Sequence, residues 1–186
     1  MNQLDFYLDI KLLPDPEFET QDLLNALFSK FHRAMSQTVP GKIGVSFPEV
    51  DKRLGSVLRL HGSESELGLL MENNWLKGMR DYCQISKIEP VPNAVQYRTV
   101  KRVQMKSAHN KRKRSIAKGW LTPEQAEEQI PDSQQKRNPF PFIEMKSLSN
   151  QNRMRVYIYH GELQSEPSEG TFNSYGLSAT ATIPWF

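Results

Sequence analysis

The order of hydrophobic patterns in the first 90 residues restricts the fold more than any other feature of this sequence. Apolar positions recur there alternately at the two-residue period of a strand and at the three-to-four-residue period of a helix. The pattern predicts strand, helix, strand, strand, helix and strand over residues 5–12, 20–39, 42–47, 56–61, 63–71 and 82–88, with Pro40 and Gly41 ending the first helix. This is the split βαβ order of a ferredoxin-like domain, which RNA-recognition domains share. The expected fold class is therefore α+β, with a ferredoxin-like βαββαβ domain at the N-terminus.

Punctuating residues place the ends of these elements and a domain boundary. Thr20 is the expected N-cap of the first helix, and Ser63 that of the second. Prolines within residues 90–92 interrupt the pattern after the fourth strand. We therefore expect two domains, the ferredoxin-like domain over residues 1–94 and a second α+β domain over residues 95–186.

The second half mixes strands with a basic helix. A helix rich in Lys and Arg is expected over residues 108–118, and Thr122-Pro123-Glu124 has the residue types that begin another. The tail from Thr171 onward has too many small residues to form a helix. Strands are expected over residues 97–105, 142–148 and 153–160.

Charge is distributed unevenly along the chain. No Asp or Glu occurs between Pro90 and Pro123, and the nine basic residues there exceed the net charge of +3, so the rest of the chain is acidic. Because like charges repel, such a block favours an anionic partner, and nucleic acid is the natural candidate. A solvated basic face and a disordered arm are the alternatives. The nine residues are Arg98, Lys101, Arg102, Lys106, Lys111, Arg112, Lys113, Arg114 and Lys118.

Several functional classes are disfavoured. The single cysteine, Cys83, excludes an internal disulfide and a multi-cysteine metal site, and it suggests a reducing, cytoplasmic location. No apolar run approaches the roughly 20 residues that span a bilayer, so no membrane partner is expected. The histidines lack zinc-motif spacing and the acidic residues form no magnesium cluster, so we expect no metal and no cofactor. A nuclease of this kind would favour RNA, whose 2′-hydroxyl can attack the adjacent phosphate when a histidine acts as base.

Four histidines are candidates for that base. His32 lies at the edge of the apolar stripe of the first helix, where a histidine is ordinarily a partly buried surface residue. His61 ends a strand and His160 precedes a glycine at a hairpin, so structural roles are expected for both. His109 lies within the basic block and would contact phosphate.

Seven short segments carry a resemblance that extends over nearly the whole chain. In order they are IGVSFP (43–48), RVQMKS (102–107), KRKRSIAK (111–118), IPD (130–132), KSLSN (146–150), SYGLS (174–178) and PWF (184–186). Together they resemble the type I-F CRISPR repeat-processing endoribonucleases, the Csy-system members of the Cas-six superfamily. The resemblance implies cleavage of CRISPR precursor RNA at the 3′ base of the repeat stem-loop, without a metal. The products would carry a 2′,3′-cyclic phosphate and a 5′-hydroxyl.

The resemblance also implies which residues act. His32 corresponds to the family's general base, Ser147 to the serine that holds the ribose 2′-hydroxyl, and Tyr175 to the tyrosine that orients the histidine. Arg102 and Gln104 correspond to the pair that reads purine edges in the stem, in keeping with bidentate pairing to guanine and adenine. The residues expected to contact RNA are Arg102, Gln104, Lys106, Ser107, Lys111, Arg112, Lys113, Arg114, Lys118, Ser149 and Met154.

Some positions depart from the family pattern, and two other functions are considered. Met154 stands where the family has an aromatic residue that stacks under the terminal base pair, and Ala117 replaces a basic residue of the helix. Several lysines replace arginines there, and lysine lacks the planar fork of arginine. The protein is expected to stay on the crRNA hairpin with the other protein subunits of the type I-F surveillance complex. A non-catalytic RNA-hairpin-binding subunit is the first alternative, and a DNA-binding or ribosomal-type basic protein the second.

Overall fold

The computed structural model describes residues 4–105, 107–134, 138–146 and 152–186. These residues form two antiparallel sheets and four α-helices, which confirms the α+β class. The chain divides into two compact units, a larger one of residues 1–103 and 140–186 and a smaller one of residues 104–139. The boundary expected between residues 94 and 95 falls between the strands of the two sheets, which both belong to the larger unit. That boundary therefore stays a prediction.

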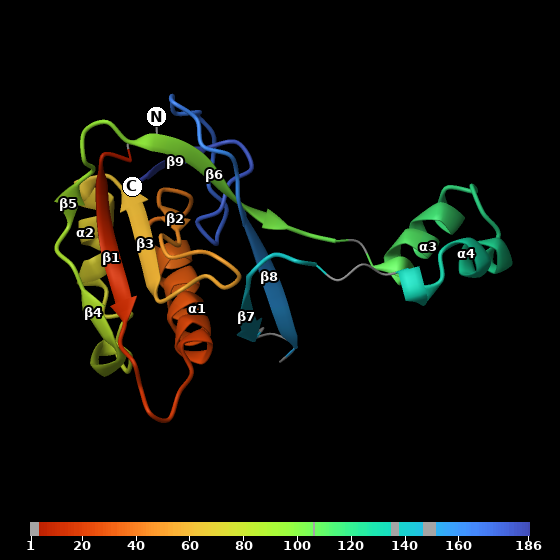
Figure 1. Cartoon of the computed structure of the whole chain (residues 1–186), viewed down its shortest axis with the longest axis horizontal. Helices are drawn as coiled ribbons and strands as arrows, with labels where there is room; N and C mark the ends of the chain where they lie inside the picture. Colours follow the sequence, from red (N-terminus) through yellow and green to blue (C-terminus); the bar gives the residue numbers. More distant parts are fainter. Residues whose placement is uncertain (1–3, 106, 135–137, 147–151) are drawn as a thin grey trace. The chain divides into compact units, whose positions relative to one another are not determined.

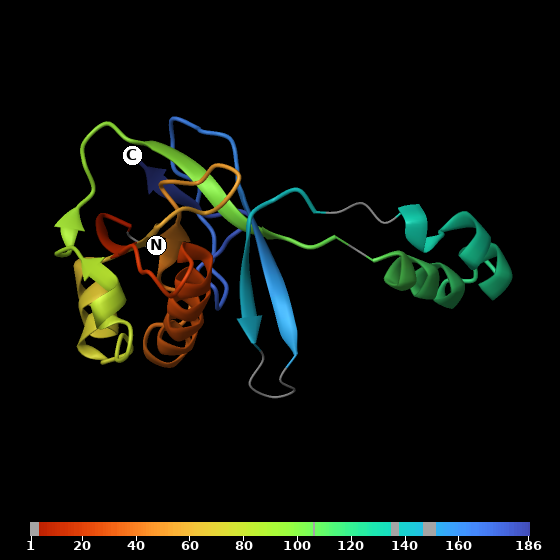
Figure 2. The ribbon, with the colours of Figure 1, turned by 60° about the horizontal axis from the view of Figure 1, so that its bottom comes forward.

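The first sheet contains the predicted order of strands and helices. Its central strand, β1, pairs with β3 on one side and with β4 and β5 on the other, and β2 extends the sheet beyond β3. Figures 1 and 2 show α1 and α2 side by side on one face of this sheet. The elements are β1 (Phe6–Leu12), α1 (Thr20–Thr38), β2 (Gly44–Ser46), β3 (Val57–Gly62), α2 (Glu64–Glu72), the 3-10 turn Arg80–Tyr82, β4 (Cys83–Ile85) and β5 (Glu89–Pro90).

The two helix starts differ in how they are capped. Ser63 caps α2 as predicted, since its hydroxyl accepts the Glu66 amide and the Glu66 carboxylate reaches back to the Ser63 amide. Thr20 is instead the first residue of α1, and the N-cap is Glu19, which makes no side-chain capping bond. The prediction of Thr20 as the N-cap was therefore wrong by one position. Packing compensates, because the α1 stripe from Leu23 to Met35 is buried.

The fourth strand is shorter than predicted because a serine side chain interrupts its ladder. Ile10 of β1 opposes Ile85, but Tyr7 opposes Glu89, so three residues on one strand face two on the other. This is a β-bulge. The Ser86 hydroxyl accepts a hydrogen bond from the Asp9 amide at 2.9 Å, in place of a backbone carbonyl.

The second sheet has the order β7-β8-β6-β9 and shares one continuous core with the first. Its last strand was not foreseen. Pro184 lies within it and is tolerated because β9 is at the sheet edge. Beyond it, the Phe186 carbonyl accepts a bond from Arg59 of β3 at 2.7 Å. The strands are β6 (Gln96–Val103), β7 (Phe142–Lys146), β8 (Arg153–His160) and β9 (Thr182–Trp185).

The smaller unit consists of α3 (Ala108–Ala117), α4 (Pro123–Gln129) and the 3-10 turn Asp132–Gln134. Among its described residues, the buried apolar ones are Ala108 and Ala126, one from each helix. Thr122 caps α4 with Pro123 in the first turn, as predicted. With so little apolar surface to bury, polar contacts between the two helices become important for holding them together.

Candidate active site and basic helix

His32 is held by a backbone carbonyl from a distant segment. The residue is half-buried at the edge of the buried stripe of α1, and its Nδ1 lies 2.5 Å from the carbonyl oxygen of Ser174. A carbonyl can only accept a hydrogen bond, so Nδ1 must carry the proton and donate it. In the neutral ring, Nε2 then holds the lone pair. The contact thus selects the tautomer in which Nε2 can act as a base.

Tyr175 packs against the same imidazole. The two rings are stacked, with centroids 4.5 Å apart and planes at 17°. The guanidinium carbon of Arg102, on β6, lies 5.5 Å from the centroid of the Tyr175 ring. Three of the predicted site residues, from α1, β6 and the C-terminal tail, therefore meet around one tyrosine ring.

The loop that carries Ser174 and Tyr175 is organised by Asn173. Its side-chain oxygen accepts the backbone amides of Tyr175 at 2.9 Å and Leu177 at 3.1 Å. Gly176 follows with a φ of 71°, a conformation that favours glycine. The Gly176 carbonyl accepts the Val45 amide at 3.0 Å, so β2 supports this loop directly.

Sequence reasoning missed Asn173 and Ser174. The Ser174 contribution is a backbone carbonyl, which leaves no trace in residue type. Asn173 does leave one, because Asn three positions before Gly is a common turn composition. The resemblance pointed to Tyr175 and passed over the residue that positions it.

Three of the predicted site residues lie outside the described residues, namely Ser147, Ser149 and Lys106. The strands that flank residues 147–151 are described, and Met145 pairs with Met154 across them. Met154 is partly buried and packs against the core.

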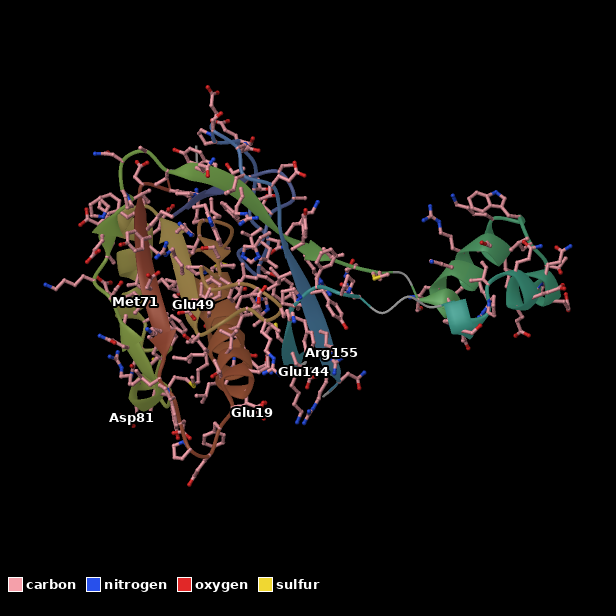
Figure 3. The ribbon with its side chains drawn as sticks, viewed as in Figure 1. Glu19, Glu49, Met71, Asp81, Glu144 and Arg155 are labelled. Carbon is pink, nitrogen blue, oxygen red and sulfur yellow. The ribbon has the colours of Figure 1, made fainter. Side chains whose placement is uncertain are left out.

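Two exposed arginines lie on β8 beside Met154. Arg153 and Arg155 share one acidic partner, Glu144 of β7, at 3.1 and 3.3 Å. Figure 3 shows Glu144 and Arg155 next to one another on these neighbouring strands. The two arginines and one glutamate leave this end of the β7–β8 pair with an excess of positive charge.

His61 and His160 are buried in the core, as structural roles require. His61 Nε2 lies 2.8 Å from the Ser46 hydroxyl, and burial lowers its pKa to about 3. The ring of His160 meets Phe47 and Trp185 edge-on, and burial lowers its pKa to about 4. Both rings are therefore neutral near pH 7. Both are also buried, whereas a base that acts on a substrate must be accessible to it.

The basic helix α3 uses its side chains in two ways. Ser107 caps the helix, since its hydroxyl accepts the Asn110 amide at 3.1 Å. Arg112 faces α4, where it donates to the Ile130 carbonyl at 2.6 Å and to Asp132 at 2.9 Å. Its side chain is only 17% exposed. The IPD segment (130–132) thus serves to bind Arg112 within the smaller unit.

The other basic side chains that the structure describes in this unit are exposed. Gln104 also is exposed, just after β6 ends at Val103 rather than within the strand predicted to reach residue 105. The exposed basic residues that were predicted to contact RNA are Lys111, Lys113, Arg114 and Lys118.

Among the described residues, no group of three or more His, Cys, Asp or Glu side chains is arranged to hold a metal ion. No helix in the described part of the chain combines the length and apolar character needed to cross a membrane.

Comparison with known proteins places the chain in a family. The family model described as CRISPR-associated protein (Cas_Csy4) matches residues 7–186. The CRISPR-associated endonuclease Cas6/Csy4 of Escherichia coli (strain UTI89 / UPEC) is 50% identical over 184 residues, covering 98% of this chain and 100% of the relative. The protein of the same name from Pseudomonas aeruginosa (strain UCBPP-PA14) is 41% identical over 187 residues, with the same coverage.

A solved structure, that of the CRISPR endoribonuclease Cse3 bound to a 19 nt RNA, aligns with a TM-score of 0.42 at 15% identity and covers 97% of this chain and 100% of that one. The family model and the two full-length relatives are decisive by themselves: the chain belongs to the Cas6/Csy4 family of CRISPR-associated proteins.

Proposed function

We propose that this protein is an endoribonuclease that cuts CRISPR repeat RNA at the 3′ base of the repeat stem-loop. The observation that carries the proposal is His32, which donates from Nδ1 to the Ser174 carbonyl and is stacked on Tyr175. An imidazole fixed at one nitrogen, with the other available as a base, is what attack by a ribose hydroxyl requires. The names of the two full-length relatives, both endonucleases, support the same activity.

The proposed reaction needs only groups of the protein and the RNA. Nε2 of His32 takes the proton from the 2′-hydroxyl at the cleavage site, and the 2′-oxygen bonds to the adjacent phosphorus. The bond from phosphorus to the 5′-oxygen breaks, that oxygen takes a proton from water, and the proton gained by His32 returns to water, so the protons balance. A 2′,3′-cyclic phosphate and a 5′-hydroxyl result, and no metal or cofactor takes part. Ser147 is proposed to hold the 2′-hydroxyl beside His32, and Ser149 to lie near the cut.

Recognition is proposed to rest on the second half of the chain. Arg102 and Gln104 would read purines at the bottom of the stem, and the basic helix would contact its phosphates. Because these contacts lie in the stem on the 5′ side of the cut, cleavage removes none of them. The protein would therefore remain on the crRNA hairpin and join the other subunits of the type I-F surveillance complex in the cytoplasm.

A finer description of the fold belongs to the same proposal. We infer that the first sheet and its helices form a ferredoxin-like domain over residues 1–94, followed by an RNA-recognition domain over residues 95–186. The strand order β2-β3-β1-β4, with α1 and α2 on one face, supports this inference. The smaller unit would then be an insertion in the second domain that carries the basic helix.

Replacing the proposed base tests the activity directly. His32→Ala should reduce single-turnover cleavage of the repeat hairpin by roughly two to four orders of magnitude, the usual worth of general-base catalysis. Hairpin affinity should change little, because the proposed binding contacts lie elsewhere. Gln37→Ala, an exposed change on the same helix, is the matched control.

The same assay distinguishes the proposed nuclease from the main alternative. A non-catalytic hairpin-binding subunit would bind the RNA, and neither the unaltered protein nor His32→Ala would cut it. Near-normal cleavage by His32→Ala would show that another group is the base.

A further inference from the structure

Trp120 is the most exposed large apolar side chain in the described part of the chain. It is 64% exposed, whereas Trp75 is 8% exposed and buried in the core. An indole is a large, rigid apolar surface with a polar N–H, and tryptophan is enriched at binding interfaces for that reason. The question is whether the local backbone explains its presence.

The backbone around Trp120 forms a Schellman turn that ends α3. Gly119 has a φ of 69°, its amide donates to the Ile116 carbonyl at 2.9 Å, and the Trp120 amide donates to the Ser115 carbonyl at 3.0 Å. In this motif the residue after the glycine usually packs its apolar side chain on the residue that accepts its bond. Here that residue is Ser115, which is polar. Helix termination therefore explains Gly119 but not the indole.

The charges around Trp120 indicate the kind of partner. The Lys118 ammonium lies 4.6 Å from the centroid of the indole ring. Lys111 and Arg114 continue from Lys118 along one side of α3, because residues three and four apart share a helix face. All three basic side chains are exposed. An aromatic surface at the end of a basic stripe suits a ligand that is both planar and anionic.

We propose that Trp120 and Lys118 form a subsite for one unpaired base of the RNA hairpin. The indole stacks on the base, and the Lys118 ammonium meets its phosphate. Nucleic-acid sites commonly combine aromatic stacking with basic side chains in this way. A single ammonium can cover only one face of the indole, which leaves the other face for the base. The inference rests on the proposed function and deepens it, because it assigns recognition to an unpaired nucleotide outside the stem.

The test combines protein variants with altered RNA. The probe is the repeat hairpin with 2′-deoxyribose at the cleavage site, together with versions that are abasic at one unpaired position each. Trp120→Ala should weaken binding of the intact hairpin by about tenfold, and Trp120→Phe by less, because a smaller ring still stacks. Leu69→Ala removes another exposed apolar side chain, 51% exposed on α2, and should bind like the unaltered protein.

Combining Trp120→Ala with the abasic hairpins identifies the base that stacks on Trp120. At one abasic position, the unaltered protein should lose about the same tenfold, and Trp120→Ala should lose nothing further. Binding of the intact hairpin should also quench tryptophan emission in the unaltered protein, and this quenching should be much reduced in Trp120→Phe. Thermal melts followed by circular dichroism check that both variants are folded.

Two results would overturn the subsite. One is equal affinity of Trp120→Ala and the unaltered protein for every hairpin, with unchanged quenching in Trp120→Phe. The other is normal RNA binding by Trp120→Ala with lost association with other protein subunits, which would make Trp120 a protein contact. Cleavage of the unmodified hairpin is measured in parallel, so failure of the nuclease proposal would be recognised separately from failure of this binding subsite.

Discussion

A histidine acts as a base through the ring nitrogen that its protein partner leaves free. In His32 the Ser174 carbonyl engages Nδ1, and the Tyr175 ring packs flat on the imidazole. The first contact sets the tautomer and the second limits rotation of the ring. Catalysis depends on such positioning, since small misplacements of a reacting group are costly.

The role of Tyr175 can be separated into ring and hydroxyl. Tyr175→Phe keeps the stacked ring and should cleave at close to the normal single-turnover rate. Tyr175→Ala removes the ring and should lower the rate by about ten- to a hundredfold, with hairpin affinity less affected. Rates are measured with protein in excess over labelled hairpin. Equal rates for Tyr175→Ala and the unaltered protein would mean that the stack does not position His32.

The buried histidines predict how stability depends on pH. Burial, with added repulsion from Arg59 and Arg98, lowers the pKa of His61 to about 3 and of His160 to about 4 in the folded protein. The unfolded chain, with the ordinary pKa of 6.5, takes up protons that the folded protein excludes. The free energy of unfolding should therefore fall as the pH decreases through 6.5. Between pH 7 and pH 5 the two residues together should cost about 3 to 4 kcal/mol.

Guanidinium unfolding at pH 7, 6 and 5 measures this loss. His160→Phe keeps an aromatic ring beside Phe47 and Trp185 and should remove about half of the pH dependence. A free energy of unfolding that stays constant over this range in the unaltered protein would show that the two rings are accessible to protons in the folded state.

At the scale of elements, hydrophobic periodicity predicted the helices and strands whose buried face is a regular apolar stripe. The order of the first six elements was predicted because α1 and the paired strands bury regular apolar stripes. The exceptions have local causes. The Ser86 hydroxyl shortened β4 through a bulge that depends on its partner strand, and β9 contains a proline that is tolerated only at a sheet edge. Neither cause can be read from one segment alone.

The basic residues of α3 have two different roles, which composition alone did not distinguish. Arg112 is held between Ile130 and Asp132 within the smaller unit, so its loss would act on folding as well as on binding.

The salt dependence of binding is better tested on the exposed stripe of Lys111, Arg114 and Lys118. Replacing these three with alanine should lower the slope of log affinity against log salt by roughly two to three units, and by less for a single-stranded partner.

The matched control replaces three exposed lysines of the larger unit, Lys52, Lys77 and Lys87, with alanine. Its slope of log affinity against log salt should equal that of the unaltered protein. Hairpin binding is measured by fluorescence anisotropy over a range of potassium chloride concentrations. A slope that is the same for the stripe variant and the control would show that the stripe is a solvated face.

At the scale of the whole molecule, only the fold connects the parts of the site. His32 and Ser174 are 142 residues apart, and periodicity has no means of bringing them together. The family resemblance named His32 and Tyr175, and the structure stacks their rings. The Ser174 carbonyl could be identified only from the folded structure, because a backbone group leaves no signal in residue type.

The central claim is that the protein cuts RNA through the substrate's own 2′-hydroxyl, with a histidine base and no metal. The direct measurement is cleavage of the labelled repeat hairpin in excess EDTA, with end-group analysis, beside a hairpin that has one 2′-deoxyribose at the cleavage site. We predict full cleavage of the first, with a 2′,3′-cyclic phosphate and a 5′-hydroxyl, and tight binding without cleavage of the second. A strict magnesium requirement, a 5′-phosphate on the downstream fragment or cleavage of the 2′-deoxy hairpin would contradict the account.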